Sequence, residues 1–297
     1  MRPAGSVGRL HLERPLPILT PDQVEEAACV EPDATLATSF LEPDARARVI
    51  ALLLFGHEIG RARTVVSEPG LAAIRLQWWR DTIDQIYTSK VVRAQPTAIA
   101  LAETVREVAL PRQLFDEMIN GYEAELEAQP FAAWQDLYEY LSATHGNLMR
   151  LCLLAAGTPT ITSTLNEAAR QAGTAWGLSQ LMRALPQWCS RRSLWLPKTD
   201  TQNLNLELLF NGEVTPQLVG CLKGVQAQIK QSRQHANAAL RTANVGAPFP
   251  VFAKTCLASR YAKIHFPNVG KDWTIAADPS LLERQLRLTI AVACRRV

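Results

Sequence analysis

The chain has 297 residues, of which 47% are hydrophobic and 20% are charged, and its formal net charge at pH 7 is +3. This balance is ordinary for a globular protein that buries a sizeable core. The positive excess is small and no dense Lys/Arg block occurs, so nucleic acid is not an expected partner.

Cysteine usage and hydropathy exclude further classes of protein. No two cysteines have C-x-x-C spacing, which predicts buried thiols in a reducing compartment and no disulfide framework. The six are Cys29, Cys152, Cys189, Cys221, Cys256 and Cys294. The histidines are equally dispersed, so no zinc site is expected. The longest strongly apolar run, residues 49–55, is far shorter than the roughly 20 residues of a bilayer-spanning helix.

The first 20 residues are expected to form a disordered leader, because they are rich in proline and lack an apolar segment. Residues 21–297 are predicted to form one domain. Its helices are expected to follow one another, since proline suits the first turn of a helix and recurs at suitable intervals. Helix starts are predicted near Pro21, Pro43, Pro96, Pro111, Pro216 and Pro279.

Apolar periodicity supports the same interpretation. Leu76, Trp79, Ile83 and Ile86 recur at intervals of three and four and form one stripe of a helix. A long helix is predicted over residues 131–156, and another over 250–265. No alternating run bounded by a hairpin turn is present. The fold class predicted is therefore all-α: a single-domain helical bundle around a central cavity.

Residues 167–200, EAARQAGTAWGLSQLMRALPQWCSRRSLWLPKTD, form the central stretch of this bundle. Between Glu167 and Asp200 the stretch contains no acid but several basic residues. Pro186 falls inside the predicted helix, where it should kink or end the helix at a cost of about 3 kcal/mol. The polar face of this helix is thus a candidate binding surface with an unusual charge.

Common catalytic motifs are absent: the sequence has no G-x-S-x-G, P-loop, G-x-G-x-x-G or H-E-x-x-H pattern. Asp81 and Asp84 lie three residues apart on one helix face, a spacing that suits Mg²⁺ with substrate phosphates. A solvated helix face is the favoured interpretation of this pair. His57 and His145 are interpreted as core histidines. Of the adjacent Trp78 and Trp79, one is expected in the core and one at its edge.

Several segments resemble the squalene/phytoene synthase family, whose members have the isoprenoid synthase fold. Leu110-Pro111 followed by Phe115, Met118, Ile119 and Gly121 resembles the family's "LP…F…MI.G", and residues 137–157 resemble the helix that follows. Ala172-Gly173, Arg183 and Trp195-Leu196-Pro197 resemble "A..lG.a.QltNilRD…GR.YLP". The resemblance covers roughly residues 39–197. It implies two Asp-rich helices that face each other across a cavity and hold Mg²⁺ for prenyl diphosphates.

The chain departs from the family's pattern at both Asp-rich motifs. In the first, Gly60, Arg61 and Thr64 stand where the resemblance places acids, and Glu58 is the nearest acid. The second aligns with residues 180–188 and retains Arg183 alone. The positions that the resemblance assigns to this pocket are Glu58, Gly60, Arg61, Thr64, Gln180, Arg183, Ala184, Gln187 and Trp188. No catalytic residue, cofactor-binding residue or metal ligand is predicted.

The pattern of residues 62–87 resembles one branch of the family, the phytoene-synthase-like mitochondrial assembly factor for respiratory complex I and its bacterial relatives. The resemblance implies a protein without catalysis that acts in assembly or binds an isoprenoid or lipid. Arg183, Arg191 and Arg192 would then contact an anionic head group without metal, or form a solvated basic turn. The expected partners are such a ligand and a complex I subunit.

Two other functions remain open from the sequence. A divergent prenyl transferase would recruit Asp81, Asp84, Glu123 or Glu125 as Mg²⁺ ligands; Mg²⁺ is expected only in that case. A helical interaction protein would have no elongated apolar pocket. The expected compartment is the bacterial cytoplasm, at the periphery of the inner membrane, or the mitochondrial matrix if the source is eukaryotic.

Overall fold

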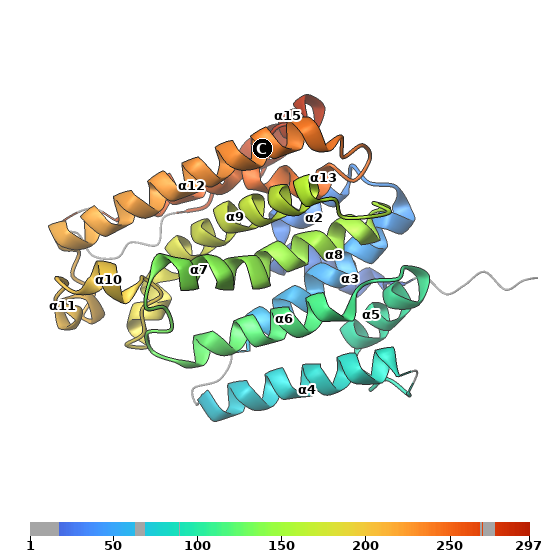
Figure 1. Cartoon of the computed structure of the whole chain (residues 1–297), viewed down its shortest axis with the longest axis horizontal. Coiled ribbons are helices and arrows are strands. Elements are labelled where there is room, and N and C mark those ends of the chain that lie inside the picture. Colours follow the sequence, from blue (N-terminus) through green and yellow to red (C-terminus); the bar gives the residue numbers. More distant parts are fainter. Residues whose placement is uncertain (1–17, 63–68, 89, 268, 270–276) are drawn as a thin grey trace, which may run out of the picture.

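The computed structural model describes residues 18–62, 69–88, 90–267, 269 and 277–297, and every regular element in these ranges is a helix. Figure 1 shows their arrangement. The elements are α1 (Pro21–Val30), α2 (Pro32–Thr38), α3 (Pro43–Gly60), α4 (Pro69–Tyr87), α5 (Pro96–Glu107), α6 (Arg112–Glu123), η1 (Ala124–Leu126), α7 (Trp134–Leu141), η2 (Ser142–Gly146), α8 (Asn147–Ala155), α9 (Ser163–Ser190), α10 (Lys198–Thr201), α11 (Leu206–Phe210), α12 (Pro216–Ala243), α13 (Pro250–Ala253), η3 (Lys254–Leu257), α14 (Ala258–Ile264) and α15 (Leu281–Cys294). The all-α class predicted from the sequence is confirmed.

Helix starts follow the local chemistry of the chain. Thr20 closes a capping box at α1: its hydroxyl accepts from the Gln23 amide at 3.3 Å, and the Gln23 side chain accepts from the Thr20 amide at 2.9 Å. Thr162 and Thr215 cap the two longest helices, α9 and α12, by accepting a hydrogen bond from the amides of Leu165 and Leu218. Leu19, beside the cap, is buried. The folded part therefore includes residues 18–20, which the predicted leader contained; residues 1–17 lie outside the described ranges.

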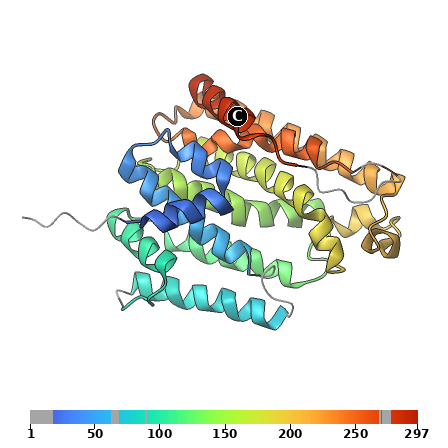
Figure 2. The same ribbon diagram turned by 180° about the vertical axis from the view of Figure 1, so that it is seen from behind.

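The long helix α9 forms the centre of the bundle, between α12 on one side and α7 and α8 on the other (Figures 1 and 2). Its buried residues run from Leu165 to Cys189, and several of its faces are covered. Pro186 does not end α9, which continues to Ser190. The helix thus begins before Glu167 and continues past Pro186, where the sequence predicted a kink or an end.

The helix expected over residues 131–156 begins at Trp134 and contains a π-helical turn, η2, between α7 and α8. Close packing against α9 accompanies this turn. A Cβ atom on Gly173 would lie 2.7 Å from the backbone nitrogen of Gly146, and one on Gly177 would lie 2.5 Å from the His145 ring. Glycine at both positions allows the two backbones to approach. The turn places His145 against α9.

Two further differences from the predicted elements lie outside the centre. Residues 198–215, predicted to be a loose connection, contain the short helices α10 and α11. The helix expected over residues 250–265 is divided into α13, η3 and α14. None of the helices in the described ranges is long and apolar enough to cross a bilayer.

Candidate functional site

A cleft of about 1040 Å³ lies where the C-terminal end of α3 meets the second half of α9. The structure brings together here six of the residues that the resemblance assigned to the pocket. They are Gly60, Arg61, Gln180, Arg183, Ala184 and Gln187. Two segments separated by more than a hundred residues thus face one cleft, as the resemblance implied for the two motif-bearing helices.

The other assigned positions lie elsewhere. Glu58 is buried behind the cleft, where its carboxylate pairs with Arg61 at 2.6 Å and with Arg75 at 3.2 Å. Trp188 is partly buried against the main core. Thr64 falls outside the described residues. Glu58 therefore neutralises arginine within the protein.

The three arginines expected to contact an anion, Arg183, Arg191 and Arg192, do not all line the cleft. Arg192 is exposed; it pairs with Glu207 and lies over the Phe210 ring at 5.3 Å, outside the cleft. Arg191 also lies outside the residues that line the cleft. Only Arg183 of the three faces the cleft, so the three arginines do not form one anion site.

Arg183 is held by its surroundings. It pairs with Asp278, and its guanidinium carbon lies 5.4 Å from the centre of the Tyr261 ring. Asp278 also contacts His265 Nε2 at 3.2 Å. Because Arg61 pairs with Glu58 and Arg183 with Asp278, both cleft arginines already have a carboxylate partner. An external anion would compete with these acids.

Three of the five histidines line the cleft: His57, His145 and His265. Burial lowers the pKa of His145 to about 3, with a smaller effect of Lys254. Burial also lowers the pKa of His57 and of His265; in His265 it outweighs the opposing contact with Asp278. His57 and His145, predicted as core histidines, are both desolvated by burial and also border the cleft, as neutral rings at pH 7.

Two polar groups of the cleft have uncommon surroundings. Gln180 Nε2 is buried and has no hydrogen-bond acceptor among the described residues. Burial raises the pKa of the Glu31 carboxyl, although Lys254 and Arg183 act in the opposite direction. The unpaired amide of Gln180 favours a ligand that offers an acceptor oxygen.

The implied Mg²⁺ does not fit this set of residues. A Mg²⁺ ion with a diphosphate needs carboxylates converging on one point. The acids that line the cleft are Glu31, whose pKa is raised, and Asp278, which is engaged by Arg183 and His265. Within the described ranges, no group of three His, Cys, Asp or Glu side chains is placed to hold a metal ion. No step through a metal is therefore derived.

The acids named for a divergent transferase are not among the residues that line the cleft. Asp81 pairs with Arg93 at 3.4 Å, and Asp84 pairs with Lys90 and Arg112 at 3.4 and 3.2 Å, on the partly exposed side of α4. Asp81 and Asp84 are therefore both engaged by basic side chains. Arg80 pairs with Glu123 at 2.7 Å, and Glu125 accepts a hydrogen bond from Tyr140.

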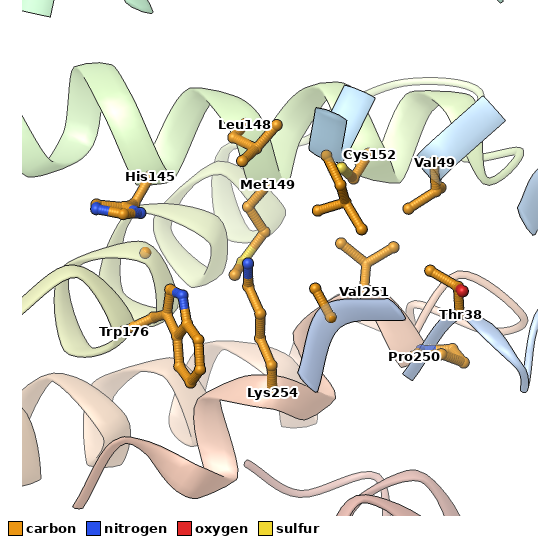
Figure 3. Close-up of a pocket in the computed structure, with 13 residues that line it drawn as sticks. Thr38, Val49, His145, Leu148, Met149, Cys152, Trp176, Pro250, Val251 and Lys254 are labelled. Atoms are coloured by element: carbon orange, nitrogen blue, oxygen red, sulfur yellow. The ribbon is translucent and has the colours of Figure 1, made fainter. Parts of the chain in front are cut away.

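Next to the cleft, the bundle contains a small inner cavity. Figure 3 shows the enclosed cavity beside α8 and α9, into which Lys254 and Trp176 project. The cavity measures about 20 Å³, room for about one water molecule. Lys254 is only 7% exposed, and its ammonium lies 5.1 Å from the centre of the Trp176 ring. His145 borders both this cavity and the cleft.

The family assignment follows from comparison with known proteins. The family model of squalene/phytoene synthase matches residues 30–263. The chain belongs to the squalene/phytoene synthase family. A dehydrosqualene synthase solved in complex with a ligand has the same fold, with a TM-score of 0.73 and 15% identity over 92% of this chain and 96% of that one.

Relatives within the family carry two kinds of name. The bovine protein "NADH dehydrogenase (ubiquinone) complex I, assembly factor 6" is 27% identical over 230 residues, which are 77% of this chain and 68% of that protein. The maize protein "Phytoene synthase 3, chloroplastic" is 21% identical over 228 residues; the match covers 75% of this chain but only about half, 53%, of the maize protein. Resemblance to both groups agrees with the sequence interpretation.

Sequence reasoning missed several residues of the site. Glu31, Tyr122, His265 and Asp278 line the cleft, and Lys254 lines the inner cavity next to it. None belongs to a motif, and each comes from a different part of the chain. For Lys254, the available signal was the apolar residues on both sides, Phe252 and Leu257, which belong to the residue types most often buried.

Proposed function

We propose that this protein is a non-catalytic member of the squalene/phytoene synthase family that acts as an assembly factor for respiratory complex I. The observation that carries the proposal is the composition of the cleft. Where the resemblance places metal-binding acids, the chain has Gly60, Arg61, Ala184 and Gln187, and the two cleft arginines pair with acids of the protein itself.

The small size of the inner cavity beside Lys254 supports the same proposal. Pockets for small-molecule ligands typically measure about 300–1,000 Å³, whereas the cavity between Trp176 and Lys254 measures about 20 Å³. A prenyl chain entering there would displace or desolvate the Lys254 ammonium, which is costly in apolar surroundings. A lipid or isoprenoid ligand of this protein would be held mainly by the cleft. The name of the bovine relative supports the assembly role.

The proposal places the protein in the bacterial cytoplasm, at the periphery of the inner membrane, or in the mitochondrial matrix if the source is eukaryotic. Its partner would be a subunit or subcomplex of complex I. The alternative, a divergent prenyl transferase, is motivated by the phytoene synthase relatives. That alternative predicts that the purified protein releases pyrophosphate from a prenyl diphosphate.

The test combines one assay in vitro with one in cells. The purified protein, incubated with Mg²⁺ and farnesyl or geranylgeranyl diphosphate, is expected to release no pyrophosphate above a heat-inactivated sample, while an active family member does so. A strain lacking the gene is expected to have less assembled complex I on native gels, restored by the wild-type gene. Pyrophosphate release with normal complex I would reverse the assignment.

A further inference from the structure

The outer face of the last helix, α15, carries an apolar stripe that no element of the described chain covers. Ten large hydrophobic side chains are exposed in the described ranges. Four of them belong to one ten-residue part of α15, residues 281–290. Leu282, Leu286 and Ile290 are 75%, 59% and 52% exposed, and their spacing of four aligns them. These three residues are called the α15 stripe. The opposite face of the helix, at Leu288 and Ala291, is buried in the core.

The segment that carries the α15 stripe is basic. Residues 279–297 contain one acid, Glu283, and four arginines. Glu283 is shared by Arg287 and by Arg260 of α14, each at 2.9 Å. Arg295 and Arg296 are exposed and form no ion pair with any carboxylate in the described part of the chain. The face therefore has an excess of positive charge.

Residues 295–297, which follow the last turn of α15, are held against α12. Asn237 of α12 accepts a hydrogen bond from the Val297 amide at 2.8 Å and donates one to the Val297 carbonyl. Val297 is buried, and Arg295 closes α15 in the left-handed conformation, with a φ of 50°. Figure 2 shows α15 at the outer edge of the bundle. The stripe and the arginine pair thus belong to one helix and its C-terminal cap, which are held against α12.

We propose that α15 docks this protein on the surface of a membrane that contains anionic lipid. Leucine and isoleucine side chains partition into the boundary between head groups and acyl chains, and adjacent arginines contact lipid phosphates. A second copy of the chain suits the surface less well. Two facing stripes would bring the arginine pairs of both copies together, and three side chains provide little of the roughly 800 Å² per partner in a stable interface.

The membrane proposal does not depend on the proposed assembly role. It is tested by co-sedimentation of the full chain with phosphatidylcholine vesicles that contain or lack phosphatidylglycerol, at low and high salt. Wild type is expected to bind the anionic vesicles and to be released by salt. The stripe variant, Leu282→Gln with Leu286→Gln and Ile290→Gln, is expected to bind about tenfold or more weakly.

Matched variants separate the contributions. Arg295→Gln with Arg296→Gln should weaken binding to the anionic vesicles several-fold and reduce its salt dependence. Leu71→Gln with Ile74→Gln changes two comparably exposed side chains of α4 and should leave binding unchanged. Equal binding of wild type to both vesicle types, or undiminished binding of the stripe variant, would overturn the proposal. A wild-type dimer in light scattering that the stripe variant abolishes, without vesicle binding, would assign the surface to a second copy instead.

Discussion

Lys254 is the most unusual single residue of the interior, because its side chain is only 7% exposed, its ammonium lies beside the Trp176 ring, and no hydrogen bond or ion pair joins it to another described residue. Replacing a buried charge by an apolar side chain of similar volume is often neutral or stabilising. The contact with the ring offsets part of the desolvation cost, by about 0.5–2 kcal/mol. Lys254→Met is therefore expected to raise the free energy of unfolding by about 1 kcal/mol, measured by urea denaturation.

Lys263 provides the matched control for this change. It lies on the neighbouring helix α14 and is exposed, so Lys263→Met should alter the free energy of unfolding by less than about 0.5 kcal/mol. If Lys254→Met destabilised the protein by more than its control, the ammonium would have to be well solvated or paired in solution. A stabilised variant would instead indicate that Lys254 is retained for a purpose other than stability.

At the scale of elements, the contact between α9 and the π-helical turn η2 determines how the bundle centre packs. A Cβ atom at Gly173 would lie 2.7 Å from the Gly146 nitrogen and 2.8 Å from its Cα, and backbone atoms cannot move aside as a side chain can. Gly173→Ala is therefore expected to lower the free energy of unfolding by about 2–3 kcal/mol. Thermal denaturation measures this as a lower midpoint.

Glycines of α12 offer the comparison. A Cβ atom at Gly220 or Gly224 would meet no atom within 4 Å. Alanine is favoured over glycine inside a helix by about 1 kcal/mol per residue, so Gly220→Ala with Gly224→Ala should raise the free energy of unfolding by about 2 kcal/mol. Helix propensity alone predicts that alanine stabilises both α9 and α12. A loss of stability in α9 together with a gain in α12 would therefore be due to packing. A stabilising Gly173→Ala would show that α9 and η2 are further apart than described.

Helix starts could be predicted from the sequence because they are local. Pro21, Pro43, Pro96 and Pro216 each occupy the first turn of an observed helix. The π-helical turn could not be predicted, because Ser142–Gly146 has no distinctive composition and its packing depends on Gly173, far along the chain. The kink or end predicted at Pro186 was wrong for a related reason. Residues far along the chain pack on both sides of α9, and the helix stays continuous.

At the scale of the whole molecule, the cleft is assembled from segments that only the fold brings together. Residues 56–61 and 180–187 could be placed in it because the resemblance predicted that they face each other. Glu31, His265 and Asp278 lie in separate segments and have no motif, so composition and periodicity carry no signal for them. The same limit applies to buried Asp33, which contacts both Tyr261 and Arg284 across the bundle.

The three cleft histidines predict how the stability of the whole protein depends on pH. Their folded-state pKa values are lowered, that of His145 to about 3 from 6.5. The unfolded chain therefore binds more protons, and the stability due to neutral rings is present above pH 6.5 and is lost as the pH falls. Glu31, whose pKa is raised, opposes the trend. The lowered pKa values of Glu167 and Glu283 affect stability only below about pH 4.5.

The free energy of unfolding is accordingly expected to fall by about 1–2 kcal/mol between pH 6.5 and 5.5, since each proton contributes about 1.4 kcal/mol per pH unit. Urea denaturation across this window measures it. His145→Gln should flatten the dependence, while His235→Gln, at an exposed position, should leave it unchanged. A stability that stayed constant or rose on acidification would mean that water reaches these rings in the folded protein. The cleft would then be more polar inside than its lining indicates.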